Sequence, residues 1–340
     1  MSNKWYRLLN TLQLMRVTLV FSAMSNVWLI VFLTHAPAVE GTESAIRSGI
    51  VGSPLWWDLA LSSGVAIGMY FFGVILNDVL DARQDKLYSP NRPIASGAIR
   101  PTNAVVLAFL ALMFSMLCAV GLGQLSAILC LICASGALFY NGLAKSLPAV
   151  GIITMGLVRG AHMMIPDPKF TFIWPVWFAM THVILVAAVC YRLERKRPRL
   201  IGWEVWGVTA GLVFWSIVLV GWMAFRDSLI VYGRPWIWGG PLVAAIVFMV
   251  VARKVAATAR VSRVSGRKLK QLGLMWLILY DALWLFGAGL WWQASLLGGL
   301  LVLSIALTMI GEHVEDLATH GKLGFQIDRR SKHARSPQFY

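Results

Sequence analysis

The sequence contains little charge. Asp, Glu, Lys and Arg together make up 13% of its 340 residues, which is roughly half the share found in ordinary water-soluble domains. Hydrophobic residues make up 58% of the chain, which is too many for an intrinsically disordered protein. Soluble globular and disordered classes are therefore excluded, and the composition is typical of a membrane protein.

Cysteine is also scarce. The four cysteines, Cys118, Cys130, Cys133 and Cys190, all lie inside apolar runs. A disulfide framework needs dense cysteine in a small secreted chain, so none is expected. The Cys130-x-x-Cys133 pair is interpreted as part of an apolar helix rather than as a redox or metal site.

Acidic residues are the rarest charged type, with 15 Asp and Glu against 30 Lys and Arg. If the N-terminus is cytoplasmic, nearly all the basic residues lie in cytoplasmic connections between apolar runs, as the positive-inside rule requires. The excess of positive charge then reports topology, and no nucleic-acid partner is expected. Runs long enough to span a membrane occur near residues 14–35, 54–76, 102–121, 124–141, 148–165, 171–190, 205–225, 236–252, 271–289 and 291–310.

The most informative acidic residues follow the second run, where residues 77–85 read NDVLDARQD. If the helix continues through this segment, Asp78, Asp81 and Asp85 are spaced i, i+3 and i+7 and share one face. Such close carboxylates repel unless a cation lies between them, and their oxygens suit Mg²⁺. The alternative is a solvated helix end whose aspartates pair with Arg83, Lys86 and Arg92.

A loop with two prolines and a glycine comes next, and residues 91–97 read NRPIASG. Its Arg92 can contact a phosphate. With these two motifs the chain resembles the UbiA superfamily of intramembrane prenyltransferases, which carries N-D-x-x-D-x-x-x-D after its second span and then R-P-x-x-S-G. The resemblance extends over roughly residues 10–310.

Two further segments are similar to UbiA motifs. Tyr140 and Lys145 stand in a Tyr…Lys segment at the end of the fourth run, and Arg159 stands in a G-x-x-R-G-x-N segment in which His162 replaces the usual Asn. Arg159 and Asp281 are charged residues inside spans, which indicates a polar interior. They are expected either to satisfy each other or a histidine, His162 or His182, as links within the bundle, or to contact substrate.

The connection between the sixth and seventh runs departs from the family pattern. Prenyltransferases of this family usually carry a second Asp-rich motif there, whereas residues 191–200 read YRLERKRPRL, with Glu194 as the one acidic residue among five cations. Either these cations bind the diphosphate in place of a metal, or the chain has lost diphosphate ionisation. A third possibility is that Glu194 is a metal ligand and its neighbours set topology only. A similar basic stretch occurs in the EboC-like branch of the superfamily.

The resemblance implies an all-α, polytopic membrane helical bundle of the UbiA type, with nine to ten transmembrane helices around a cavity open to the cytoplasm. The last run would be an addition to a nine-helix core or a re-entrant end. Residues 1–310 would form the membrane domain, and residues 311–340 a basic, polar, disordered cytoplasmic tail. The expected location is the inner (plasma) membrane.

The implied reaction is Mg²⁺-dependent transfer of a prenyl group from a polyprenyl diphosphate to an unidentified acceptor, with membrane lipid as a further partner. The rival hypothesis is a transporter or lipid-handling protein with the same fold and no transferase turnover. The implied metal ligands are Asn77, Asp78, Asp81 and Asp85; the implied catalytic residues are the three aspartates, Lys145 and Arg159; the implied substrate-binding residues are Asn77, Arg92, Tyr140, His162, Tyr191, Glu194, Arg195, Lys196 and Asp281.

Overall fold

The computed structural model describes residues 20–36, 53–88, 92–196, 198–225, 235–257 and 262–319. Every regular element among these residues is helical, so the expected all-α fold is confirmed. The helices are α2 (Val20–Thr34), α4 (Leu55–Leu80), α5 (Ala82–Tyr88), α6 (Pro101–Leu122), α7 (Gln124–Gly142), η2 (Ala144–Ser146), α8 (Pro148–Met163), α9 (Trp174–Leu193), α10 (Trp203–Phe225), η3 (Pro235–Trp238), α11 (Gly239–Ala257), α12 (Ser262–Gly287) and α13 (Trp291–Thr319).

Each of the ten predicted runs corresponds to one α-helix of the described residues. Eight helices in the described part of the chain are long and apolar enough to cross a membrane, and α2 and α8 are shorter. The 16 residues of α8 extend over about 24 Å, less than the roughly 30 Å of a bilayer core. The chain is therefore a multi-pass membrane protein. Helix α8 is too short to cross the hydrocarbon core of the bilayer by itself.

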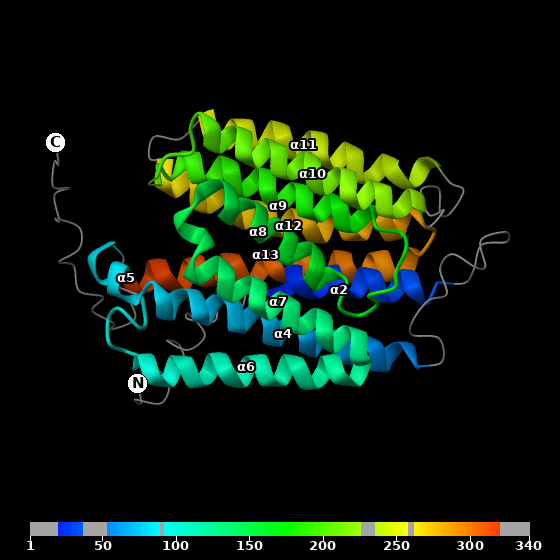
Figure 1. The fold of residues 1–340 in the computed structure, drawn as a ribbon, viewed down its shortest axis with the longest axis horizontal. Helices are drawn as coiled ribbons and strands as arrows, with labels where there is room; N and C mark the ends of the chain where they lie inside the picture. The colour runs from blue at the N-terminus through cyan, green and yellow to red at the C-terminus, as the bar shows by residue number, and fades with distance from the viewer. Residues whose placement is uncertain are drawn as a thin grey trace.

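The long helices lie side by side and run mostly along one direction, in alternating sense (Figure 1). We call the end of the bundle where α4 leads into α5 the aspartate end. Because consecutive helices are antiparallel, α7 and α9 finish there and α8 and α10 begin there. Helix α2 is buried along most of its length, whereas α6 and α10 expose large hydrophobic side chains toward the surrounding lipid.

Small residues line the most extensive helix contact among the described elements, between α4 and α6. A Cβ atom at Gly68 would lie 2.6 Å from the carbonyl oxygen of Ala111 and 2.8 Å from Cβ of Ser115. The Ser115 hydroxyl donates a hydrogen bond to the carbonyl oxygen of Val65 at 3.1 Å. Such small-residue contacts are common in membrane bundles. Lipid tails are as apolar as the side chains, so the hydrophobic effect does not drive helices together and close packing is needed instead.

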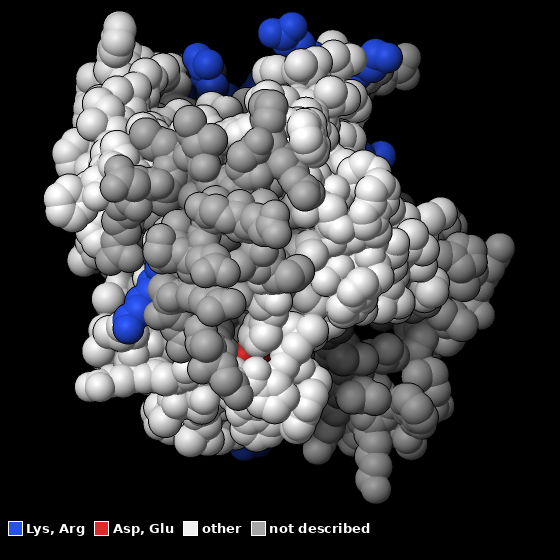
Figure 2. All heavy atoms as spheres, turned by 90° about the vertical axis from the view of Figure 1, so that its right-hand side faces the viewer, with Lys and Arg blue, Asp and Glu red and all other residues white. Residues whose placement is uncertain are grey.

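Exposed tryptophans mark the end of the bundle opposite the aspartate end. They stand at the start of α4, in η3 and at the start of α13, and comprise Trp56, Trp57, Trp236, Trp291 and Trp292. Figure 2 shows this end, where uncharged atoms make up most of the visible described surface. At the aspartate end, Trp203 and Trp206 are also exposed. Tryptophan at both ends is typical of side chains at the two membrane interfaces.

The last helix is longer than the sequence predicted. Its segment Trp291–Ile310 is long enough to cross a membrane, which favours a full tenth span over the re-entrant end. The helix continues to Thr319, past residue 310, where the membrane domain was expected to finish. Residues 320–340 of the expected tail lie outside the described residues.

Candidate active site

Three aspartates lie where α4 passes into α5. The helical hydrogen bonding continues through the junction, since the backbone N–H of Asp81 donates to Asn77 at 2.9 Å and that of Asp85 donates to Asp81 at 2.8 Å. The backbone of Asp81 itself stays in the helical region, with φ −83° and ψ −3°. The i, i+3, i+7 spacing therefore places the carboxylates toward one side of the helix end, as the sequence predicts.

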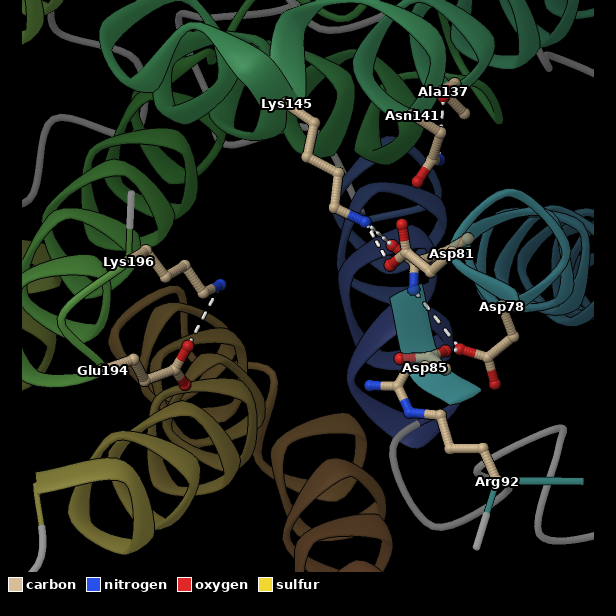
Figure 3. A network of polar contacts seen from close by, with 10 residues as sticks. Asp78, Asp81, Asp85, Arg92, Ala137, Asn141, Lys145, Glu194 and Lys196 are labelled. Carbon is tan, nitrogen blue, oxygen red and sulfur yellow. Dashed lines mark hydrogen bonds and ion pairs between the residues drawn. The ribbon is translucent and has the colours of Figure 1, made fainter. Parts of the chain in front are cut away.

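Arg92 joins two of these carboxylates. Its Nη1 lies 3.2 Å from Oδ1 of Asp78 and 2.7 Å from Oδ2 of Asp85 (Figure 3). Asp78 is buried, and its Oδ1 also accepts a hydrogen bond from the amide of Asn77 at 3.3 Å. The loop after α5 thus folds back so that one guanidinium nitrogen lies between two carboxylate oxygens.

Lys145 joins the other two polar residues of the motif. It stands in η2, and its Nζ donates to Oδ1 of Asn77 at 2.9 Å and to Oδ2 of Asp81. Gly151 lets α8 begin close to η2, because a Cβ there would lie 2.7 Å from the carbonyl oxygen of Ala144. The sequence offered Arg83, Lys86 and Arg92 as partners for the aspartates. Lys145 was implied as a catalytic residue but not as one of these partners, because it is 64 residues away from Asp81 in the chain.

The carboxylates of the motif outnumber its cations. Three carboxylates face two cations, which leaves one net negative charge among the five groups. Burial raises the pKa of Asp85 above its ordinary value; the guanidinium of Arg92 opposes this shift, and the carboxylates of Asp81 and Asp78 add to it. A further cation would therefore be favourable here.

The oxygens of the motif fit Mg²⁺ as two pairs. In the described part of the chain no three His, Cys, Asp or Glu side chains come together in a metal-binding group. Instead, Asp78 and Asp85 share one nitrogen, and Asn77 and Asp81 share another. Mg²⁺ in phosphate-binding sites usually takes one or two protein carboxylates and fills its shell with water and phosphate oxygens. Each pair meets that requirement.

The end of α9 faces this motif. Figure 3 shows Glu194 and Lys196 in the same region as Asp81 and Lys145, on the other side of the view. Nζ of Lys196 lies 3.0 Å from Oε2 of Glu194 and 5.7 Å from the centre of the Tyr191 ring. Tyr140, near the end of α7, is close enough to Asp81, Tyr191 and Glu194 to interact with them electrostatically. The structure therefore gathers these candidates at one end of the bundle.

The charged residues inside the bundle meet through Asn26 of α2. Nε of Arg159 donates to Oδ1 of Asn26 at 2.6 Å, and Nδ2 of Asn26 donates to Oδ2 of Asp281 at 2.6 Å. Ser25 also donates to Asp281 at 2.6 Å, and Nη2 of Arg159 donates to the carbonyl oxygen of Ser22 at 2.6 Å. Arg159 and Asp281 are thus linked through an amide of the first span, which sequence reasoning did not include as their partner.

The two buried histidines differ in their hydrogen-bond partners. Nε2 of His182 lies 3.0 Å from the carbonyl oxygen of Gly273, and its Nδ1 lies 3.3 Å from the hydroxyl of Tyr280. His162 is buried, and neither of its ring nitrogens has a hydrogen-bond partner among the described residues. Neither histidine is hydrogen bonded to Arg159 or Asp281 in the described part of the chain.

The fold and this end of the bundle define a class: a multi-pass helical membrane protein with a cluster of Asp and Asn side chains where one of its longest helices ends. Residues 45–190 match the model described as the UbiA prenyltransferase family. This segment includes both motifs and the Tyr140, Lys145 and Arg159 positions, so the resemblance to the UbiA superfamily is confirmed. The match ends at residue 190, immediately before the basic loop.

Solved structures share the fold of this chain. A digeranylgeranylglyceryl phosphate synthase aligns with a TM-score of 0.52 and 16% identity, covering 83% of this chain and 98% of its own. The apo structure of a UbiA homologue from Aeropyrum pernix K1 aligns with a TM-score of 0.51 and 16% identity, covering 78% and 96%. At these identities the likeness concerns the fold alone. No curated protein sequence matches the chain significantly.

Proposed function

We propose that the protein transfers a prenyl group from a polyprenyl diphosphate to an acceptor. In this proposal it lies in the plasma membrane, with the aspartate end facing the cytoplasm. The observation that carries the proposal is the pairing of four side-chain oxygens with two cations at the end of α4. Carboxylate and amide oxygens hold Mg²⁺, and Arg and Lys hold phosphate, so one group of residues supplies both requirements of a diphosphate leaving group.

The residues of the motif have distinct roles in this proposal. Asp78 and Asp85, and Asn77 and Asp81, supply oxygens to Mg²⁺, which when bound withdraws charge from the diphosphate. Arg92 and Lys145 leave the carboxylates and donate hydrogen bonds to phosphate oxygens. These charge-assisted contacts strengthen as negative charge develops on the leaving group, so they favour cleavage of the bond between the allylic carbon and oxygen.

The transfer itself is a substitution at the allylic carbon. The carbon–oxygen bond breaks with its electron pair on the diphosphate, the acceptor supplies the electron pair of the new bond, and the acceptor's proton leaves with the diphosphate. The apolar helices hold the prenyl chain and keep water from the allylic centre. Arg159, His162, Asp281 and Tyr140 are proposed to contact the substrates within the bundle.

The basic loop favours the rival function, a transporter or lipid-handling protein with the same fold. The segment 191–200 supplies a single carboxylate, and that carboxylate is paired with Lys196. A protein of this kind would bind a prenyl diphosphate without cleaving it. Release of pyrophosphate separates the two functions.

The test is pyrophosphate release from farnesyl or geranylgeranyl diphosphate by purified protein with Mg²⁺. We expect release by the wild type and its loss in Asp78→Asn and Asp81→Asn. Asp58→Asn is the matched control, since Asp58 is a buried carboxylate on the same helix that contacts Ser53 and His35 at the opposite end. Equal release by all four proteins, or binding without release by the wild type, would contradict the proposal.

A further inference from the structure

A basic pocket lies between the end of α9 and the start of α10. Its volume is about 460 Å³, and no carboxylate is among its lining residues in the described part of the chain. The lining consists of Tyr191, Arg192, Arg195, Lys196, Arg199, Leu200 and Ile201. Arg199, which is not among the candidate residues implied by the sequence, also lies in this wall.

The acidic residue of this loop points elsewhere. Glu194 packs against α12, where a Cβ at Gly266 would lie 2.6 Å from its Cγ, and it pairs with Lys196. The three arginines of the wall make no ion pair with any described residue. The pocket therefore carries at least three unneutralised positive charges, which calls for an anionic ligand.

The backbone holds Arg195 in an unusual conformation. Helix α9 ends in a Schellman motif, with the N–H of Lys196 donating to Tyr191 at 3.3 Å and that of Arg195 donating to Arg192 at 3.2 Å. Arg195 occupies the left-handed position of this motif, with φ 50°. Glycine is the usual residue there because a side chain strains the backbone. An arginine at this position indicates that its guanidinium is used.

The pocket is also fixed in shape. The hydroxyl of Tyr191 donates to the carbonyl oxygen of Pro198 at 2.8 Å, which ties the two ends of the loop together. The ammonium of Lys196 lies over the ring of the same tyrosine. A planar guanidinium can donate two parallel hydrogen bonds to a phosphate, and several such groups around one pocket form a phosphate site.

We propose that this pocket binds a phosphate group in place of a second metal site. The phosphate comes either from the diphosphate of the prenyl substrate, a source that rests on the proposed function, or from the headgroup of an anionic phospholipid. Lys196, which lines the pocket, appears in the same close view as Asp81 (Figure 3), which agrees with the first source. Trp203 and Trp206 are exposed at the start of α10, and exposed tryptophans are typical of membrane interfaces, which agrees with the second.

The test compares a pocket variant with a charge-matched control. The pocket variant carries Arg192→Gln, Arg195→Gln and Arg199→Gln; the control carries Arg83→Gln, Arg100→Gln and Arg253→Gln, three exposed arginines outside the pocket. One measurement is calorimetric titration of inorganic pyrophosphate with Mg²⁺. The other is native mass spectrometry of phosphatidylglycerol retained from nanodiscs that contain it.

We expect the pocket variant to lose at least about ten-fold in pyrophosphate affinity, or most of its retained phosphatidylglycerol, while the control stays within about two-fold. Loss in the first measurement identifies the substrate diphosphate as the source, and loss in the second alone identifies the lipid. If the pocket variant and the control behave alike in both measurements, the proposal is overturned.

Arg195→Gly separates ligand binding from folding. Glycine suits the left-handed position, so the thermal midpoint should stay the same or rise while phosphate binding falls. Failure of the proposed function is detected separately. If the wild type binds pyrophosphate through the pocket but releases none from geranylgeranyl diphosphate, the transferase function is rejected and the phosphate site is retained. If Arg195→Gly and the pocket variant both bind the two probes as the wild type does, the proposed phosphate-binding role of the pocket is rejected, whether or not the protein releases pyrophosphate.

Discussion

Arg92 and Lys145 each place a positively charged nitrogen between two oxygens that the proposed function assigns to a metal ion. Nη1 of Arg92 contacts Asp78 and Asp85, and Nζ of Lys145 contacts Asn77 and Asp81. If those oxygens bind Mg²⁺, these side chains compete with the metal for the same ligands in the substrate-free protein. When a diphosphate arrives, it offers both side chains alternative partners, so metal and diphosphate are expected to bind together.

This competition predicts opposite effects of one substitution on two ligands. Arg92→Gln should tighten binding of Mn²⁺ alone by roughly ten-fold, equivalent to about 1.4 kcal/mol, because a competing cation is removed. The same variant should bind Mg²⁺–pyrophosphate more weakly, because a phosphate contact is lost. Electron paramagnetic resonance titration of Mn²⁺ and calorimetry of pyrophosphate measure the two affinities. Arg83→Gln is the control, and unchanged or weaker Mn²⁺ binding by Arg92→Gln would refute the competition.

Helical periodicity made part of this site predictable from the sequence. The spacing of Asp78, Asp81 and Asp85 determines their shared face once the chain is helical, and the motif match named Arg92 and Lys145 as candidates. Which oxygen each cation contacts depends on how the loop and η2 fold back, which periodicity does not contain. Asn26 was missed for a similar reason: a lone amide in an apolar run gives no sign of a partner on another helix.

At the scale of elements, α4 carries two kinds of glycine. Gly68 lies against α6, where an added methyl group would meet backbone atoms of Ala111 and Ser115, whereas a Cβ at Gly73 would meet nothing within 4 Å. The position of α4 relative to α6 depends on the first glycine and is independent of the second. Since the aspartate motif continues from α4, this packing also positions the site.

Gly68→Ala should therefore separate α4 from α6 and lower the free energy of unfolding by about 1–3 kcal/mol, the usual cost of overpacking. Gly73→Ala, the matched change one and a half turns away, should leave stability the same or raise it, because alanine favours a helix more than glycine does. Thermal unfolding in one detergent measures both. Equal midpoints for the two variants would show that the close contact with α6 is unimportant.

At the scale of the whole molecule, the ten helices and their order were predictable because apolar runs of about 20 residues are strong signals. The end of α13 at Thr319 was not, because the polar residues after 310 carry no apolar signal although the helix continues through them. The orientation of the bundle rests on the distribution of Lys and Arg, which predicts that the aspartate end is cytoplasmic.

Cysteine labelling tests this orientation. A cysteine at Ser96, exposed at the aspartate end, should react with a membrane-impermeant maleimide only in inverted vesicles, and one at Lys169, exposed at the opposite end, should react in intact cells. The four native cysteines lie within helices, three of them buried, and give little background. Labelling of the Ser96 position from outside intact cells would reverse the topology.

The amide of Asn26 connects residues that are made at very different times. Its partner Asp281 follows it by 255 residues, which corresponds to roughly 13–50 s of synthesis at about 5–20 residues per second. Helix α2 is present throughout that interval, and Arg159, 133 residues after Asn26, is added partway through it, before the carboxylate that balances them exists. Helix α2, the first described helix, is therefore among the last to complete its contacts, and the insertion machinery or water must shelter its polar side chains until α12 arrives.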